Sequence, residues 1–338
     1  MKEKFLIIKK KNYELIERQK QRKSKILRGY PYWLTIDPTN ICNLKCVFCP
    51  TGQDRENYRP QVAMPLKMFK SIMGKIGAYL LYVEFCNWGE PLLNKNLPEM
   101  IKIAKNYGAK TFLSTNLNVK MDEKSAESLV LSGIERITIS LDGASQETYE
   151  KYRRRGSFDL AIKNIQLLVE AKKRLNLKTP HLHWQFLVFK HNEHEIEKAR
   201  AMSKIVGVDD IGFTAPFCSP EWVSTIDEYN NYLVKETPEG TKETTFKHAD
   251  SKLCNWLWDA ITVNADGSVS PCCSVEDKKD DFTNLKWWKP FFFTWNHPKF
   301  VKARAQFASK TRQPQSDSDN ICVRCDHAGA SNHKDITL

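Results

Sequence analysis

The stretch WLTIDPTNICNLKCVFC, residues 33–49, combines a short strand pattern with three closely spaced cysteines. Its apolar and β-branched start, residues 33–37, predicts a buried strand. Cys42, Cys46 and Cys49 follow at once as a CxxxCxxC loop. Three thiolates this close together can hold three irons of a four-iron cluster and leave one iron without a protein ligand, which is typical of a reactive centre. The alternative is a zinc knuckle completed by a distant residue.

Downstream of this strand, short β-branched or aromatic runs alternate with amphipathic stretches. The predicted strands are residues 33–37, 80–86, 110–116, 136–142, 183–189 and 210–214, and the predicted helices are residues 66–76, 97–107, 123–132, 158–174 and 193–206. Gly108 and Gly133 stand where helix stop signals are expected. The alternation predicts parallel β/α units, as an open sheet or a partial barrel. In both architectures the chemistry lies at the carboxyl ends of the strands.

The CxxxCxxC loop, with Phe48 before its last cysteine, resembles the signature of the radical S-adenosylmethionine (radical SAM) superfamily. Further strings of that family recur in order across residues 31 to about 216. Asn87-Trp88-Gly89-Glu90-Pro91 resembles the GGEP motif. The resemblance implies that Trp88, Gly89 and Glu90 receive the methionine ammonium group of SAM.

Three more strings carry the same resemblance. Ser114 and Asn116 end the third predicted strand, and Ser140 and Asp142 end the fourth, where similar enzymes contact the ribose and methionine of SAM. Arg153 closes the string YEKYR, and in the family pattern this arginine pairs with the SAM carboxylate. An arginine suits that role because its planar fork can bind both carboxylate oxygens. The resemblance implies that a reduced cluster cleaves SAM to methionine and a 5'-deoxyadenosyl radical, which abstracts a substrate hydrogen.

A second set of cysteines lies near the C-terminus. Cys254, Cys272, Cys322 and Cys325 can saturate a second four-iron cluster, and a structural zinc site made of the same four thiolates is the alternative. This block resembles a SPASM domain shortened to the twitch form, which implies one auxiliary cluster. Cys273 beside Cys272 leaves open which of the two is the ligand.

The net charge of +12 is unevenly distributed. Residues 1–30 hold 11 Lys and Arg against 3 Asp and Glu, so the chain as a whole carries no nucleic-acid signature. This basic leader has two interpretations: it lies on anionic lipid, RNA or a partner, or it is a helix packed on the main domain. The sequence has no long apolar run and no secretory signal pattern, which predicts a cytoplasmic protein, whose reducing compartment favours metal ligation over disulfides for the ten cysteines.

Two further features remain open. The aromatic residues of segment 287–295 either cap a substrate channel, touch a membrane or pack in the core of a small cluster domain. Cys218, just after the sixth predicted strand, is either a hydrogen-atom donor in an epimerase or a buried small hydrophobe. Cys86 and Cys273 are the other thiols outside the predicted ligand sets, but each adjoins a predicted cofactor site.

The sequence therefore predicts an α/β fold, a partial (β/α)6 TIM-like barrel with a small C-terminal twitch or SPASM-like cluster domain. The expected parts are a basic leader (1–30), the barrel (31–216), a connector (217–253) and the cluster domain (254–338). The resemblance to twitch enzymes such as 2-deoxy-scyllo-inosamine dehydrogenases implies a sugar-like substrate, oxidised or epimerised at a hydroxyl-bearing carbon. The alternatives are a peptide-modifying SPASM maturase and a metal-binding nucleic-acid module. The expected partners are the substrate, an electron donor such as flavodoxin or ferredoxin, and an anionic membrane through residues 1–30; no nucleic acid is expected.

Overall fold

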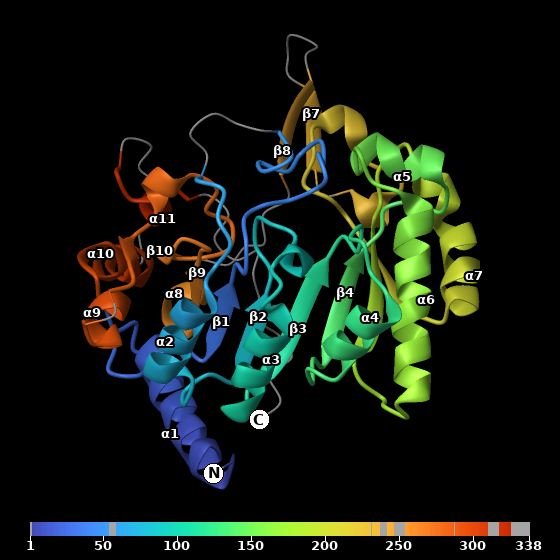
Figure 1. The fold of residues 1–338 in the computed structure, drawn as a ribbon. Helices are drawn as coiled ribbons and strands as arrows, with labels where there is room; N and C mark the ends of the chain where they lie inside the picture. The colour runs from blue at the N-terminus through green and yellow to red at the C-terminus, as the bar shows by residue number, and fades with distance from the viewer. Residues whose placement is uncertain are drawn as a thin grey trace. The chain divides into compact units, whose positions relative to one another are not determined.

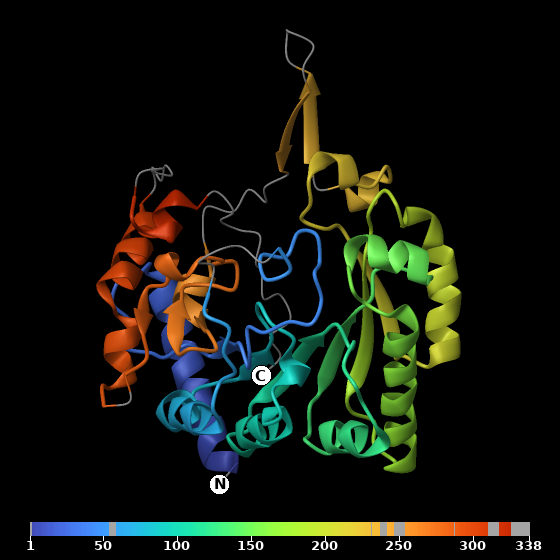
Figure 2. The same ribbon diagram turned by 45° about the horizontal axis from the view of Figure 1, so that its top comes forward.

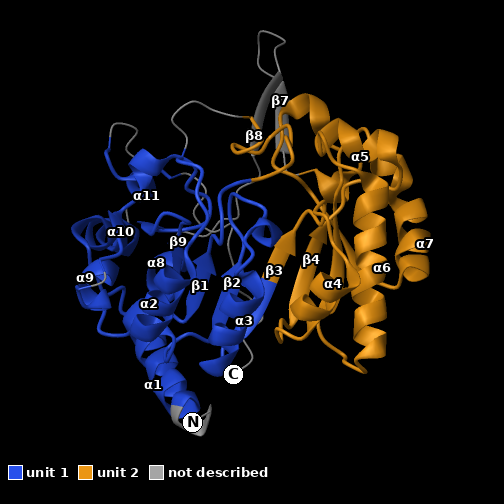
Figure 3. Ribbon diagram, viewed as in Figure 1, with its two compact units in different colours: residues 1–41, 56–112, 248–338 blue, residues 42–55, 113–247 orange. Residues whose placement is uncertain are grey.

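The computed structural model describes residues 2–53, 59–230, 232–236, 242–246, 254–286, 288–309 and 318–325. The chain divides into two compact units (Figure 3): unit 1 comprises residues 1–41, 56–112 and 248–338, and unit 2 comprises residues 42–55 and 113–247. The CxxxCxxC loop belongs to unit 2, whereas the NWGEP motif and the C-terminal cysteines belong to unit 1. None of the helices in the described part of the chain combines the length and the apolar character that crossing a bilayer demands.

Unit 1 contains a sheet with the strand order β11-β10-β9-β1-β2 (Figure 1). Its strands are β1 (Trp33–Ile36), β2 (Tyr82–Phe85), β9 (Ala260–Val263), β10 (Ser268–Ser270) and β11 (Thr283–Asn284). Strands β9 and β10 form a hairpin around Asn264–Gly267, with Gly267 at a φ of 82° that favours glycine. The sequence did not predict that β9 pairs in parallel with β1, in the register Trp33 to Ala260.

Each helix of unit 1 contains buried apolar residues. They are α1 (Lys2–Gln21), α2 (Leu66–Ile76), α3 (Leu97–Asn106), α8 (Trp256–Asp259), α9 (Phe291–Trp295), α10 (Pro298–Ala308) and α11 (Ile321–Arg324), with short 3-10 turns η1 (Pro91–Leu93) and η5 (Lys278–Asp280). The predicted helix 66–76 has the observed bounds of α2, and its Phe69, Ile72 and Met73 are buried. This spacing of three to four residues is the expected one for a helix that packs one face.

The basic leader is a packed helix. Ile16 of α1 and Leu27 just beyond it are fully buried. Lys20 forms an ion pair of 3.3 Å with Asp259, whose carboxylate also accepts a hydrogen bond of 3.0 Å from the Tyr32 hydroxyl. These contacts agree with the interpretation of a helix packed on the main domain and make residues 2–30 part of unit 1.

The parallel strands of unit 2 follow the order β4-β5-β6, namely β4 (Arg136–Ser140), β5 (His181–Leu187) and β6 (Asp210–Thr214). Strand β3 (Lys110–Thr115) contains the boundary between the units. The helices are α4 (Glu123–Val130), α5 (Gln146–Tyr152), α6 (Phe158–Arg174) and α7 (Ile196–Val206), with 3-10 turns η2 (Glu193–Glu195), η3 (Pro220–Trp222) and η4 (Asp227–Tyr229). Ser157 caps α6 by accepting a hydrogen bond from the backbone of Leu160, which starts the helix at its predicted residue.

Two elements of unit 2 were not predicted. The expected connector contains an antiparallel hairpin of β7 (Tyr232–Glu236) and β8 (Lys242–Phe246) (Figures 1 and 2). Its sequence signal is Pro238 and Gly240 between two β-branched and aromatic runs. Helix α5 was also missed, because its seven residues are too few to display a helical period, although Ser145 caps it.

Candidate active site and auxiliary cluster region

The CxxxCxxC loop of unit 2 packs into a small apolar cluster. Cys46 and Leu44 are buried there together with Tyr152, Phe189 and Cys218, and Cys42, Phe48 and Cys49 pack against them. Two backbone hydrogen bonds fix the loop to the end of α5: Lys45 N–H donates to Arg154 O at 2.9 Å and Val47 N–H donates to Tyr152 O at 3.2 Å. The loop is therefore held by residues close to the YEKYR string.

Two side-chain donors point at the sulfur atoms of the loop. The Nδ2 of Asn116 lies 3.7 Å from the Sγ of Cys42, and the Nη1 of Arg153 lies 3.8 Å from the Sγ of Cys46. Burial raises the pKa of the Cys46 thiol, and the charge of Arg153 acts in the opposite direction. N–H donors beside cysteine sulfurs suit an iron–sulfur cluster, whose potential depends on such hydrogen bonds. The donor set of the loop therefore fits the cluster that the sequence predicts.

Arg153 and Asp142 form a buried ion pair beside the loop. The Nε of Arg153 donates to Oδ2 of Asp142 at 2.6 Å, and Oδ1 of Asp142 accepts from the backbone N–H of Leu187 at 2.7 Å. The side chain of Asp142 is 0% exposed and that of Arg153 is 14% exposed. Burial raises the pKa of Asp142, an effect that Arg153 opposes. The sequence had placed both residues at the SAM site but had not predicted their pairing.

Asn118 is a structural residue of this region that the sequence interpretation missed. Its Nδ2 donates to the Tyr149 hydroxyl at 2.8 Å, and its Oδ1 accepts from the backbone of Ser157 at 2.6 Å. The backbone N–H of Asn118 donates to Oδ1 of Asn116 at 2.8 Å, which orients that predicted residue. The signal was a second asparagine in the loop after β3. Ser114 in β3 and Ser140 at the end of β4 are half-buried.

In unit 1, the NWGEP motif is tightly packed against the chain that precedes the cysteine loop. A Cβ at Gly89 would lie 1.6 Å from the backbone oxygen of Thr39, so only glycine fits there. Glu90 is 1% exposed, and its backbone N–H donates to Ile41 O at 2.9 Å. Its Oε1 accepts from the backbone of Leu92 at 3.0 Å and thereby caps η1.

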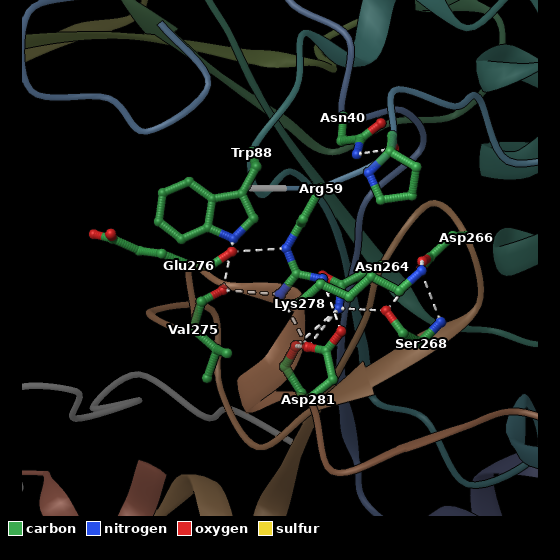
Figure 4. Close-up of polar contacts among 12 residues, drawn as sticks. Asn40, Arg59, Trp88, Asn264, Asp266, Ser268, Val275, Glu276, Lys278 and Asp281 are labelled. Carbon is green, nitrogen blue, oxygen red and sulfur yellow. Dashed lines mark hydrogen bonds and ion pairs between the residues drawn. The ribbon is translucent and has the colours of Figure 1, made fainter. Parts of the chain in front are cut away.

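Trp88 stands at the first glycine position of the resembled motif and connects it to the C-terminal region (Figure 4). Its Nε1 donates to the backbone oxygen of Val275 at 2.9 Å. Arg59 contacts the same segment: it donates to Glu276 O at 2.8 Å and forms a bidentate pair with Asp281 at 2.8 and 2.9 Å. No local sequence pattern identifies Arg59, because its partner Asp281 lies more than two hundred residues away along the chain.

Asp37, at the end of β1, provides a prediction about pH. Burial raises its pKa from 3.8 to about 8, and the backbone N–H groups of Gly89 and Trp88 and the charge of Arg59 offset only part of this effect. The folded state keeps a proton that the unfolded chain releases above about pH 4, so this residue's contribution to the free energy of unfolding falls as pH rises towards 8 and then levels off. We expect Asp37→Asn to remove that fall. Urea unfolding midpoints measured across this pH range test it, and equal pH dependence in the variant and the wild type would contradict it.

Three of the C-terminal cysteines of unit 1 lie near one another. Burial raises the pKa of Cys254, and the charges of Cys272 and Cys325 raise it further, which places these three thiols near one another. Cys273 instead interacts with Cys272 and with Glu84 of β2, and Cys86 interacts with Cys273. Cys322 is 8% exposed, and its backbone N–H donates to Oδ1 of Asn320 at 3.1 Å. Among the described residues, no three His, Cys, Asp or Glu side chains are grouped so that they could hold a single metal ion.

The remaining candidate residues, Cys218 and the aromatic segment 287–295, differ in how deeply their side chains are buried. Cys218 is 9% exposed within the apolar cluster that contains Cys46, and burial raises its pKa to about 11. In the aromatic segment, Phe291 and Trp295 are buried, whereas Trp288, Phe292 and Phe293 are exposed. Trp287 lies outside the described residues. Core packing therefore accounts for only part of this segment.

Two protein-family models match the chain. The model described as "Radical SAM superfamily" matches residues 36–202, and the SPASM model, "Iron-sulfur cluster-binding domain", matches residues 254–326. A probable GTP 3',8-cyclase of Saccharolobus islandicus (strain Y.N.15.51 / Yellowstone #2) is 28% identical over 182 residues, which are 53% of this chain and 54% of that protein. The chain thus spans about half the length of this curated relative.

Two solved structures are similar in fold. SuiB of Streptococcus suis bound to S-adenosylmethionine has a TM-score of 0.61 at 16% identity, and the match covers 87% of this chain and 71% of the SuiB chain. BtrN in complex with AdoMet and 2-DOIA has a TM-score of 0.52 at 16% identity, and the match covers 88% of this chain and 93% of the BtrN chain. The predicted α/β fold, with a six-stranded parallel core and a C-terminal SPASM region, is confirmed. The chain therefore belongs to the radical SAM superfamily and carries a SPASM domain.

Proposed function

We propose that this radical SAM enzyme abstracts hydrogen from a carbohydrate-like substrate and oxidises or epimerises it at a hydroxyl-bearing carbon. The observation that carries the proposed site is the arrangement in unit 2, where Asn116 and Arg153 direct N–H donors at Cys42 and Cys46. With Cys49, these cysteines would hold a four-iron cluster. The cluster and SAM, when bound, supply the 5'-deoxyadenosyl radical.

The residues beside the loop would orient SAM and exclude water. Arg153 is held by Asp142 through Nε alone, so the outer nitrogens of its guanidinium group are the donors proposed for the SAM carboxylate. Asn116, oriented by Asn118, is the polar group proposed to contact the ribose or methionine, together with Ser114 and Ser140. Trp88, Gly89 and Glu90 are proposed for the methionine ammonium group. The aromatic rings of Phe48, Tyr152 and Phe189 pack around the loop and would limit access of water to the cluster.

We propose Cys254, Cys272, Cys322 and Cys325 as the ligands of one auxiliary cluster. Cys272 and Cys325 both raise the pKa of Cys254, which supports three of the four ligands. Glu84 affects the pKa of Cys273, whereas Cys273 is not among the groups that affect Cys254, and this supports Cys272 over its neighbour. A single auxiliary cluster is the feature that favours a sugar-like substrate by resemblance to twitch enzymes. Flavodoxin or ferredoxin is the proposed source of the electron.

Anaerobic incubation of the reduced, iron-loaded protein with SAM tests the reaction class, because 5'-deoxyadenosine should accumulate. A screen of aminocyclitols, sugars and nucleotide sugars with a deuterium label at the hydroxyl-bearing carbon tests the substrate class. Transfer of the label into 5'-deoxyadenosine supports the proposal. Transfer only from a labelled peptide would favour the peptide-modifying alternative, and no 5'-deoxyadenosine at all would contradict both.

Cys218 distinguishes the two outcomes at the substrate carbon. An epimerase must return a hydrogen atom to the substrate radical from the opposite face. A thiol can donate that atom and becomes a thiyl radical, which one electron from the proposed flavodoxin or ferredoxin and one proton would convert back to the thiol. The thiol of Cys218 is buried, and burial raises its pKa to about 11, so it keeps its proton well above neutral pH. If the enzyme epimerises, we expect Cys218→Ala to cleave SAM and form the substrate radical without releasing inverted product, as followed by product chirality. Cys86→Ala is the matched control and should turn over normally. Full turnover by Cys218→Ala would remove it as the donor, and a ketone product would indicate a dehydrogenase.

A further inference from the structure

Exposed apolar side chains gather on one face of unit 1, around α9. Trp288 is 60% exposed, Phe293 is 59% exposed and Phe292 is 36% exposed, although Phe291 and Trp295 of the same helix are buried. Ile26, after α1, is 59% exposed. Large apolar groups exposed next to one another are unusual, whereas single ones are common.

Hydrogen bonds hold these side chains in one neighbourhood. Oδ1 of Asn296 accepts from the backbone of Leu27 at 2.8 Å, and the backbone N–H of Asn296 donates to Phe292 O at 2.9 Å. The ring centroids of Tyr30 and Phe291 are 6.0 Å apart. The turn after α1 that carries Ile26 therefore lies beside the C-terminal end of α9.

A groove of about 660 Å³ continues this face between α2 and the segment before α9. Its lining includes Met68, Ile72 and Leu285 as apolar residues, with Lys67, Lys75 and Lys286 among them. The Nζ of Lys75 donates to Lys289 O at 2.7 Å, which joins α2 to the aromatic segment. The groove thus combines an apolar floor with cationic edges.

The charge of the three segments that build this face has a single sign. Residues 18–31, 65–79 and 285–302 contain 13 Lys and Arg and not one Asp or Glu. Some of these cations are used internally, such as Lys20 with Asp259, but Lys25, Arg28, Lys67, Lys286 and Lys289 are exposed. The face therefore attracts anions over a wide area.

We propose that this basic–aromatic face, defined by Ile26, Lys67, Lys75, Lys286, Trp288, Lys289, Phe292 and Phe293, binds the surface of an anionic phospholipid bilayer. Trp and Phe side chains partition into the interface between headgroups and acyl chains, and lysines beside them pair with lipid phosphates. A polynucleotide would also pair with the lysines and stack on the aromatic rings. An exposed aliphatic side chain such as Ile26 and an apolar groove instead favour contact with lipid acyl chains. Binding of this face to a membrane does not depend on which substrate the enzyme uses.

Vesicle co-sedimentation of the full-length, iron-loaded protein tests this proposal. We expect binding to vesicles of phosphatidylcholine and phosphatidylglycerol in equal parts, weakened by salt, and far less binding to phosphatidylcholine alone. The combined replacement Lys67→Gln, Lys286→Gln and Lys289→Gln should weaken binding by roughly fivefold per lysine, on the order of a hundredfold in all. The matched control replaces three exposed lysines of unit 2, Lys163→Gln, Lys173→Gln and Lys204→Gln, and should bind as the wild type does.

A second pair of variants separates apolar insertion from charge attraction. Phe292→Ser with Phe293→Ser should weaken vesicle binding even at high salt, whereas Ile205→Ser, at a position 83% exposed in unit 2, should not. Unchanged thermal unfolding and cluster absorption show that each variant is folded. Deletion of residues 1–25 is a poor test, because it removes Lys20 from its buried partner Asp259.

Three results would overturn the proposal. The first is equal binding to both kinds of vesicle, and the second is an equal loss of vesicle binding in the variants and in their unit 2 controls. The third is displacement of the protein from vesicles by RNA when heparin carrying the same total charge does not displace it. The last result would assign the face to a nucleic acid.

Discussion

The variant in which Cys42, Cys46 and Cys49 are all replaced by alanine is expected to form no 5'-deoxyadenosine. The auxiliary cysteines lie in unit 1 and the loop cysteines in unit 2, so the remaining cluster should assemble. Anaerobic reconstitution of the wild type should yield about eight irons for two four-iron clusters, and the variant should keep roughly half of them. Iron analysis and chromatography of the SAM cleavage products measure both effects.

The matched control removes two thiols outside the proposed ligand sets, Cys86→Ala with Cys218→Ala, and should keep its iron and its SAM cleavage. A triple variant that still produced 5'-deoxyadenosine would show that the loop does not hold the SAM cluster. A triple variant without any iron would show instead that the auxiliary set does not bind a cluster by itself. Cys272→Ala compared with Cys273→Ala then identifies the auxiliary ligand, because only the ligand's loss should lower the iron content.

Replacing Arg153 by alanine should weaken SAM binding and destabilise the fold at the same time. SAM affinity should fall by more than about tenfold if the guanidinium group binds the carboxylate through two hydrogen bonds. The free energy of unfolding should fall by about 3–5 kcal/mol, because Asp142, 0% exposed, would be left as an unpaired buried carboxylate. Equilibrium dialysis with SAM and urea unfolding measure the two losses separately.

A second variant separates these two roles of Arg153. Asp142→Asn combined with Arg153→Ala removes the buried charge as well, so it should regain much of the lost stability without regaining SAM affinity. Arg153→Lys keeps the charge but loses the planar fork, and it should bind SAM more weakly than the wild type. Unchanged SAM affinity in Arg153→Ala would assign the carboxylate contact to another residue, with Arg154 and Arg155 as the next candidates.

Local signals in the sequence predicted most of the α/β pattern. Helices α2 and α6 have their predicted bounds because each has a strong apolar period and α6 has a serine cap. The first five predicted strands end one or two residues too late, as in β4, which ends at Ser140, whereas the sixth has the bounds of β6. Polar residues just beyond a strand carry the same alternation as the strand itself, so the pattern alone does not mark where hydrogen bonding stops.

The contacts between distant segments were not predictable in the same way. Arg59 pairs with Asp281, and β9 pairs with β1, because the tertiary fold brings distant segments together. The local hydrophobic period of a sequence contains no information about such contacts. At the site, motif strings identified Asp142 and Arg153 separately, but only the structure gives their 2.6 Å contact. The cysteines were the easiest residues to find, because their spacing along the chain is itself the signal.

The parallel pairing of β9 with β1 has a consequence for any attempt to shorten the protein. A chain that stopped before Cys254 would lose β9 and leave the full length of β1, with its buried Leu34 and Ile36, as an open sheet edge. Bare apolar edges recruit strands from other molecules. The C-terminal region therefore covers this sheet edge and prevents self-association, in addition to carrying the C-terminal cysteines. We expect a shortened enzyme to aggregate into the insoluble fraction rather than to remain soluble without its auxiliary cluster.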